Sequence, residues 1–123
     1  MAIGTEENTP GERRFRVEQR VCGEVTVLDL TGSLTGPRVT MLRKKLAMAV
    51  ARRSTPFIAV DTTRVDEIDS FGCRILVGAS RHARDADGLV IIVGSADWEA
   101  PGDEPTLRPS LEEALIELAK RRR

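Results

Sequence analysis

The stretch VDEIDSFGCRILV, residues 65–77, decides the fold because it joins a polar segment to an apolar, helix-like pattern. Asp69 and Ser70 stand side by side just before the apolar run. Both residue types cap helix N-termini, since their side-chain oxygens accept hydrogen bonds from unpaired backbone N–H groups. The stretch therefore predicts a helix over residues 71–85, and it leaves open which of the two residues is the N-cap.

Hydrophobic patterning on both sides of this helix predicts alternating strands and helices. Short alternating or continuously apolar runs predict strands over residues 15–21, 25–30, 56–61 and 89–94. Apolar residues three and four apart predict helices over residues 38–53, 71–85 and 110–123. The order β-β-α-β-α-β-α indicates an α/β fold with a mostly parallel or mixed sheet.

Several turn and capping residues mark the ends of these elements. Gly23 is expected to take a positive φ in a hairpin turn, and Gly88 to be the left-handed cap of the helix over residues 71–85. Ser110 and Glu113 form the pattern of a capping box. Residues 95–109 are rich in Pro, Gly and acids, and we expect them to form a surface loop without much regular structure.

Composition limits the possible functions. The chain has 123 residues with 19 basic and 19 acidic side chains, and its length predicts one domain. We expect a disordered leader over residues 1–14, a domain over residues 15–119 and a basic tail over residues 120–123. Without that tail the chain is mildly acidic, and it has few aromatic residues. Because nucleic-acid-binding surfaces are basic or carry exposed aromatics, we expect no direct nucleic-acid partner.

The inventory of reactive side chains predicts neither an enzyme nor a cofactor site. Cys22, Cys73 and the single His82 do not have the spacing of a zinc site, and no apolar run is long enough to insert into a membrane. We therefore expect a cytoplasmic protein with no metal or cofactor. Cys73 in the first turn of its helix allows two interpretations, a reactive thiol or a small buried side chain, and burial is favoured.

The Ser70 hydroxyl has two possible roles. It caps the helix, or Asp69 caps the helix and leaves the hydroxyl available at the helix opening. A phosphate on Ser70 would carry about −1.5 to −2 charges and would face the positive end of the helix dipole. Arg74 lies within reach four residues on, and Asp69 would oppose the phosphate. Such a site would act as a switch on a docking surface, because its charge would change without unfolding the protein.

Three segments resemble the STAS domain family, the fold of bacterial anti-sigma factor antagonists. They are LDLTGSLTGPRVTMLRKKL (residues 28–46), FIAVDTTRVDEIDSFGCRILVGASRHARDADGLVIIVGSA (residues 57–96) and SLEEAL (residues 110–115). The match covers about residues 15–119 and includes an Asp-Ser-x-Gly element at residues 69–72. The resemblance implies a four- to five-stranded mixed sheet with helices packed mainly on one side.

The resemblance also implies a function in transcription regulation and stress response. Ser70 matches the serine that an anti-sigma factor of the serine-kinase type phosphorylates. In that scheme the unphosphorylated protein binds the anti-sigma factor and frees a sigma factor. Phosphorylation breaks the complex, and a phosphatase restores it. We expect the partner to contact residues around the serine, namely Asp66, Glu67, Asp69, Phe71, Gly72 and Arg74.

Two further functions remain open at this point. STAS-like proteins also serve as scaffold or accessory subunits of signalling and lipid-transport complexes, and a mildly acidic chain without an enzyme site fits that role equally well. A thiol redox sensor using Cys73 is the third candidate, and it requires a low thiol pKa. The chain departs from the family pattern at Thr35, where many members carry Asp, and at Phe71, where a small residue is common. A homodimer is also left open.

Overall fold

The computed structural model describes residues 15–36, 39–52, 54–94 and 106–121. Some predictions concern residues outside these ranges, namely the leader over residues 1–14, most of the loop over residues 95–109 and the last two residues of the basic tail. Lys120 and Arg121, the first residues of the predicted tail, belong to the last turn of the final helix.

The described chain contains five strands and three helices in the order β-β-α-β-α-β-β-α. The strands are β1 (Arg16–Cys22), β2 (Val25–Leu34), β3 (Phe57–Ile68), β4 (Leu89–Val93) and β5 (Thr106–Arg108). The helices are α1 (Val39–Ala51), α2 (Ser70–Asp85) and α3 (Leu111–Arg121).

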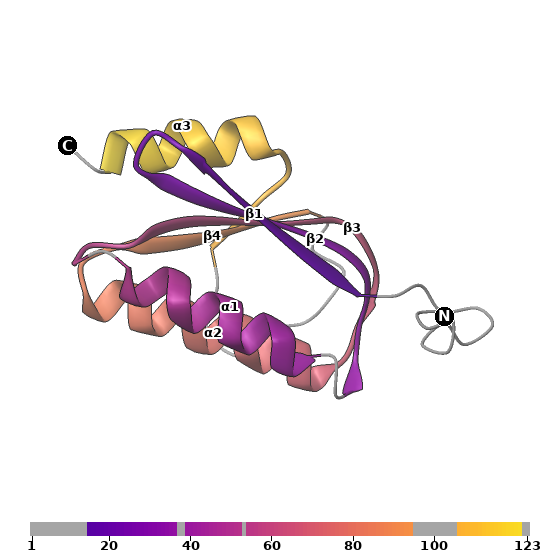
Figure 1. Ribbon diagram of the computed structural model, residues 1–123. Helices are drawn as coiled ribbons and strands as arrows, with labels where there is room; N and C mark the ends of the chain where they lie inside the picture. Colours follow the sequence, from indigo (N-terminus) through magenta and orange to yellow (C-terminus); the bar gives the residue numbers. More distant parts are fainter. Residues whose placement is uncertain (1–14, 37–38, 53, 95–105, 122–123) are drawn as a thin grey trace, which may run out of the picture.

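The strands form one mixed sheet in the order β1-β2-β3-β4-β5. β1 and β2 make an antiparallel hairpin, whereas β2, β3, β4 and β5 are parallel neighbours. Gly23 has the predicted positive φ in the hairpin turn. Figure 1 shows α1 and α2 side by side on one face of the sheet and α3 on the opposite face. The predicted fold class, an α/β fold with a mixed sheet and most helices on one side, is confirmed.

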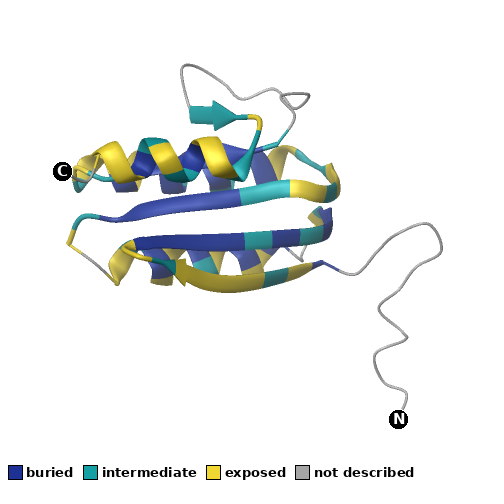
Figure 2. Cartoon of the chain, turned by 90° about the horizontal axis from the view of Figure 1, so that it is seen from above, coloured by how far each residue is buried: buried dark blue, intermediate teal, exposed yellow. Residues whose placement is uncertain are grey.

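Two hydrophobic layers, one on each face of the sheet, form the core. All five residues of β4 are buried, and their side chains alternate between the layers. Val90 and Ile92 pack with α1 and α2, while Leu89, Ile91 and Val93 pack with α3. Because both faces are covered, the sequence of β4 is continuously apolar. In Figure 2 the buried residues concentrate in the inner strands, and the outer strand β1 is mostly exposed.

Strands β2 and β3 extend beyond their predicted ends, and β5 is an additional strand. The end of β3 pairs with the end of β2 up to the partners Leu34 and Ile68. β5, Thr106–Arg108, lies inside the segment predicted as an irregular loop, so that prediction is wrong for these three residues. β5 pairs with β4, and Arg108 forms an ion pair with Glu117 of α3 at 2.7 Å. A three-residue strand is too short to show an alternating pattern.

The cap at the end of α2 also differs from the prediction. Asp87, not Gly88, takes the left-handed conformation, with a φ of 64°. The Asp87 N–H donates to the Arg84 carbonyl at 2.9 Å and the Gly88 N–H to the Ala83 carbonyl at 2.7 Å, which is a Schellman motif. Gly88 is needed for a different reason, because a Cβ there would lie 1.9 Å from the Pro56 carbonyl oxygen.

The start of α3 agrees with the predicted capping box. The Glu113 N–H donates to the Ser110 hydroxyl at 3.2 Å, and the Ser110 hydroxyl lies 3.5 Å from the Glu113 carboxylate. Ala114 and Leu118 of this helix are buried against the sheet. The capped first turn therefore directs the apolar side of α3 onto the second core layer.

Substitution by alanine should change the free energy of unfolding in opposite directions at Gly78 in α2 and at Gly88 in its C-terminal cap. We expect Gly88→Ala to lower the free energy of unfolding by about 1–3 kcal/mol, because its Cβ would overlap the Pro56 backbone. Gly78→Ala is the matched control, and it should raise that free energy by about 0.5–1 kcal/mol, since nothing lies within 4 Å of its Cβ position. Urea denaturation followed by circular dichroism measures both. Equal effects of the two substitutions would contradict the close-approach argument.

Candidate functional site

The candidate site lies where β2 and β3 end and α2 begins. The last registered pair of these strands is Leu34 and Ile68, and the Asp69 N–H donates to the Leu34 carbonyl at 3.2 Å. α2 therefore starts directly at the carboxyl ends of β2 and β3, beside the connection from β2 to α1. The carboxyl ends of parallel strands commonly carry functional sites in α/β proteins.

Asp69 holds this edge together, and its side chain is the N-cap of α2. One carboxylate oxygen accepts a hydrogen bond from the Gly72 N–H at 2.9 Å. The other accepts a hydrogen bond from the Gly36 N–H at 2.9 Å, across 33 positions of sequence. We call this pair of hydrogen bonds the Asp69 clamp. Gly36 has a φ of 61°, a conformation that favours glycine at this turn.

The clamp keeps Asp69 ionised. Partial burial raises the pKa of its carboxyl, but hydrogen bonds from the backbone N–H groups of Gly36 and Gly72 outweigh that effect, with smaller contributions from Phe71 and Asp69 itself. The net result is a pKa below the usual aspartate value. The start of α2 therefore carries a negative charge at neutral pH.

Gly72 allows the first turn of α2 to pack tightly against β2. It is buried, and a Cβ there would lie 2.8 Å from Ile68 Cγ1 and 3.0 Å from Leu34 Cγ. Gly72 was predicted to contact the partner, but it is buried, and it supports the exposed residues around it.

Five of the predicted site residues are exposed around the start of α2. We call them the Ser70 surface, and they are Asp66, Glu67, Ser70, Phe71 and Arg74. Ser70 is the first residue of the helix, and the Phe71 side chain is 60% exposed, unusual for an aromatic residue. Asp66 and Glu67 lie on the part of β3 that leaves the core. Ser70, Phe71 and Arg74 thus lie in the first turns of α2, where Asp69 and Gly72 support them, and Asp66 and Glu67 lie near the end of the preceding strand.

The structure decides which residue caps the helix. Asp69 supplies the cap, so the Ser70 hydroxyl is not needed for it. Since the Gly72 N–H already donates to Asp69, a phosphate on Ser70 would meet an ionised carboxylate beside the helix opening. Ser70 is exposed, so a group added to its hydroxyl would lie on the surface of the protein.

Cys73 lies behind this surface and is buried, with 7% of its area exposed. Burial raises the pKa of its thiol, and the negative charge of Asp69 raises it further. The favoured interpretation, a buried structural cysteine, is confirmed for its position. A redox sensor requires the opposite, a lowered thiol pKa and an accessible sulfur.

Other kinds of site find little support in the part of the chain that the structure describes. Within those residues no group of three or more His, Cys, Asp or Glu side chains could hold a metal ion. His82 is exposed on α2. No described helix has the length and apolar character needed to cross a membrane.

One feature of the site was missed by the sequence analysis. The β2–α1 connection contributes Gly36 to the Asp69 clamp. The signal for it is the glycine-rich stretch TGSLTG, residues 31–36. The positive φ of Gly36 marks a tight turn, and the N–H group of Gly36 finds its hydrogen-bond acceptor in Asp69.

Comparison with known proteins agrees with this geometry. Residues 17–100 match a protein-family model described as "Mlab, STAS domain". No curated protein sequence matches the chain closely enough to count as a relative.

Solved structures share the fold at low sequence identity. The unphosphorylated anti-sigma factor antagonist SpoIIAA has a TM-score of 0.65 and 22% identity, and the match covers 87% of this chain and 98% of that one. Bacillus SpoIIAA in its phosphorylated form has a TM-score of 0.64 and 24% identity, and the match covers 85% of this chain and 98% of that one. An anti-sigma factor antagonist from Mycobacterium paratuberculosis has a TM-score of 0.68 and 20% identity, and the match covers 86% of this chain and 95% of that one.

Removing the Asp69 clamp should weaken the fold. We expect Asp69→Ala to lower the free energy of unfolding by about 2–3 kcal/mol, because it removes a helix cap and a hydrogen bond to an ionised acceptor. Ser70→Ala is the matched control and should change that free energy by less than about 0.5 kcal/mol. Urea denaturation at pH 7 compares them, and an equal loss in both would show that Ser70 shares the capping role.

The same clamp should make stability depend on pH. Since the folded pKa of Asp69 is lowered, its contribution is complete above the unfolded aspartate pKa of about 3.9 and is lost as the pH falls through the folded value. Asp69→Asn should therefore remove part of the fall in stability below about pH 4. Denaturation curves between about pH 2.5 and pH 7 measure this, and an unchanged pH profile would contradict it.

The two cysteines should react at different rates. We expect Cys73 to alkylate much more slowly than Cys22, because Cys73 is buried with a raised pKa and Cys22 is only half-buried. Iodoacetamide labelling at pH 7.5 with mass spectrometry measures the two sites separately. In denaturant both should react at similar rates, and fast labelling of folded Cys73 would restore the redox-sensor hypothesis.

Proposed function

The chain belongs to the STAS domain family, and from this premise we propose that it is an anti-sigma factor antagonist that works by partner switching. The observation that carries the proposal is the exposed Ser70 at the start of α2, beside an Asp69 that caps the helix independently. This arrangement separates the modifiable hydroxyl from the groups that hold the fold together.

In the binding state Ser70 is unphosphorylated. Phe71 offers a large exposed apolar side chain next to the small hydroxyl, and aromatic side chains of this kind often anchor protein interfaces. Asp66, Glu67 and Arg74 surround it with charges suited to the polar rim of an interface. The partner is an anti-sigma factor of the serine-kinase type. When this protein binds to it, the anti-sigma factor releases its sigma factor.

Phosphorylation reverses the binding. The kinase transfers the γ-phosphoryl group of ATP to the Ser70 oxygen, the serine proton passes to a base of the kinase, and ADP leaves. The new group carries about −1.5 to −2 charges and lies next to the ionised Asp69. A partner surface that accommodated a neutral hydroxyl would then have to desolvate this charge, so the complex dissociates.

The fold tolerates the added charge because Ser70 makes no contribution to the cap. The N–H groups that hold Asp69 remain in place, and the two core layers lie behind the surface. A phosphatase that removes the phosphoryl group restores the original surface. The cycle therefore changes affinity and leaves stability nearly constant.

A second candidate is a scaffold or accessory subunit of a larger complex. The observation that favours it is exposed apolar surface away from Ser70, notably Met48, which is 64% exposed on α1. Surfaces of this kind mark protein interaction sites when they are contiguous. Light scattering of the protein purified with its native partners discriminates the two functions, since a kinase complex is small and a scaffold assembly is large.

Charge at Ser70 should abolish binding without unfolding the protein. We expect Ser70→Asp to weaken binding to the cognate anti-sigma kinase by at least about thirtyfold, because it places an uncompensated charge in the interface. Its free energy of unfolding should stay within about 0.5 kcal/mol of the wild-type value. Titration calorimetry and urea denaturation measure the two quantities.

Two further variants serve as controls. Ser54→Asp adds the same charge at another exposed serine and should leave binding unchanged. Ser70→Ala should bind the kinase and resist phosphorylation, as read by mass spectrometry. Retained binding by Ser70→Asp, or phosphorylation at a different residue, would refute partner switching through Ser70.

A further inference from the structure

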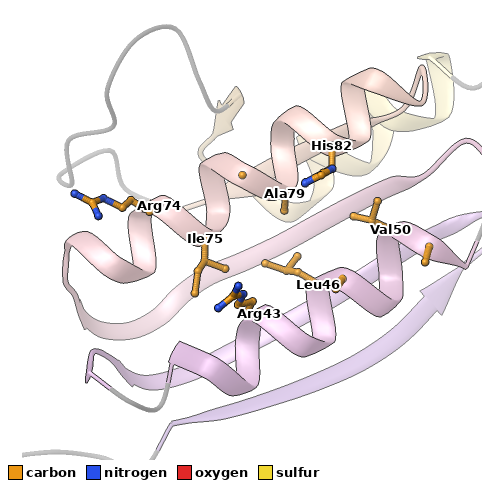
Figure 3. Close-up of a pocket in the computed structure, with 10 residues that line it drawn as sticks. Arg43, Leu46, Val50, Arg74, Ile75, Ala79 and His82 are labelled. Carbon is orange, nitrogen blue, oxygen red and sulfur yellow. The ribbon is translucent and has the colours of Figure 1, made fainter.

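A groove of about 480 Å³ lies between α1 and α2. Leu46 and Val50 of α1 and Ile75 of α2 form its apolar lining, as Figure 3 shows. Leu46 and Ala79 are buried members of the core layer and form the floor of the groove, whereas Ala47, Ala51 and His82 line it and are exposed. The groove therefore opens on the outer surface of the helix layer rather than toward the sheet.

Small residues keep this groove open. Ala47 on α1 and Gly78 on α2 both line it, and nothing lies within 4 Å of the position where a Gly78 Cβ would be. Larger side chains at these positions would fill the gap between the helices. Because close packing of apolar surfaces is the rule within proteins, an unfilled apolar gap between two helices leaves contact surface for another molecule.

The charges around the groove are positive. The two charged lining residues, Arg43 and Arg74, lie at one end, the polar imidazole of His82 lies at the other, and none of the described lining residues is acidic. The rest of α1 adds Lys44 and Lys45 and contains no acid. A positive rim around an apolar lining selects a partner with the opposite charge at its edges.

The dimensions favour a helix over a small molecule. The lining runs along α1 from Arg43 to Ala51, about 12 Å at 1.5 Å per residue, which matches two turns of a partner helix. Small-molecule sites enclose most of their ligand. Here Ala47, Ala51 and His82 are exposed, so the groove is open along its length. Amphipathic helices bind open grooves of this kind through apolar residues at positions i, i+3 or i+4, and i+7.

We propose that the α1–α2 groove binds an acidic amphipathic helix of a partner protein, with the apolar stripe of that helix on Leu46, Val50 and Ile75 and its acids beside Arg43, Arg74 and His82. This binding site is additional to the proposed switch, because its lining excludes Ser70 and shares only Arg74 with the Ser70 surface. The occupant is recognised by shape and charge, and its binding requires no phosphorylation.

The experiment uses the full chain and a synthetic helical peptide of about four turns with leucines at i, i+3, i+7 and i+10 and glutamates elsewhere. We expect amide shifts in NMR spectra at Ala47, Gly78 and His82, and an affinity that falls as salt is raised. Ala47→Glu places an acid in the groove and should weaken binding at least about tenfold. Met48→Glu is the matched control on the same helix, outside the lining, and should bind as the wild type does.

Three results would overturn the proposal. The first is equal binding of a peptide with the same composition in scrambled order. The second is an equal effect of Ala47→Glu and Met48→Glu. The third is binding of anionic phospholipid vesicles that both variants reduce, which would assign the whole outer face of α1 to a membrane surface. Because the peptide contains no kinase, failure here leaves the Ser70 switch untouched.

Discussion

The carboxylate of Asp69 is the group on which the rest of the site depends. It accepts hydrogen bonds from Gly72, three residues later, and from Gly36, in a connection 33 positions earlier. The first bond starts α2, and the second fixes the β2–α1 connection against that start. One side chain therefore sets both the helix boundary and the shape of the edge on which Ser70 and Phe71 are displayed.

In the proposed switch, this arrangement would separate stability from partner binding. The two core layers and the Asp69 clamp hold the fold, whereas the Ser70 surface consists of side chains that the fold does not need. A phosphorylated residue that also capped the helix would couple every change of partner to a loss of stability. Two adjacent residues with similar capping ability, of which only Asp69 is used, avoid that coupling.

The sequence predicted the fold and the start of α2 beside Asp69 and Ser70, because periodicity and capping act over short distances. It could not choose between Asp69 and Ser70, since both can cap and the deciding contact with Gly36 comes from another part of the chain. β5 was missed because three residues carry no periodicity. The groove was missed because Ala47 and Gly78 look like ordinary surface residues until α1 and α2 are placed side by side.

The Ser70 surface and the α1–α2 groove share α2 but need not share a mechanism. Ser70 and Gly78 are eight residues apart, about 12 Å along the helix, which exceeds the Debye length of about 8 Å at physiological salt. Arg74 is only four residues from Ser70, about 6 Å, and it lines one end of the groove. A phosphate at Ser70 would therefore reduce the positive field at that end and leave the His82 end almost unaffected. A partner that occupied both surfaces would lose its contact at Ser70 on phosphorylation, while one that occupied the groove alone would lose only part of its attraction to Arg74.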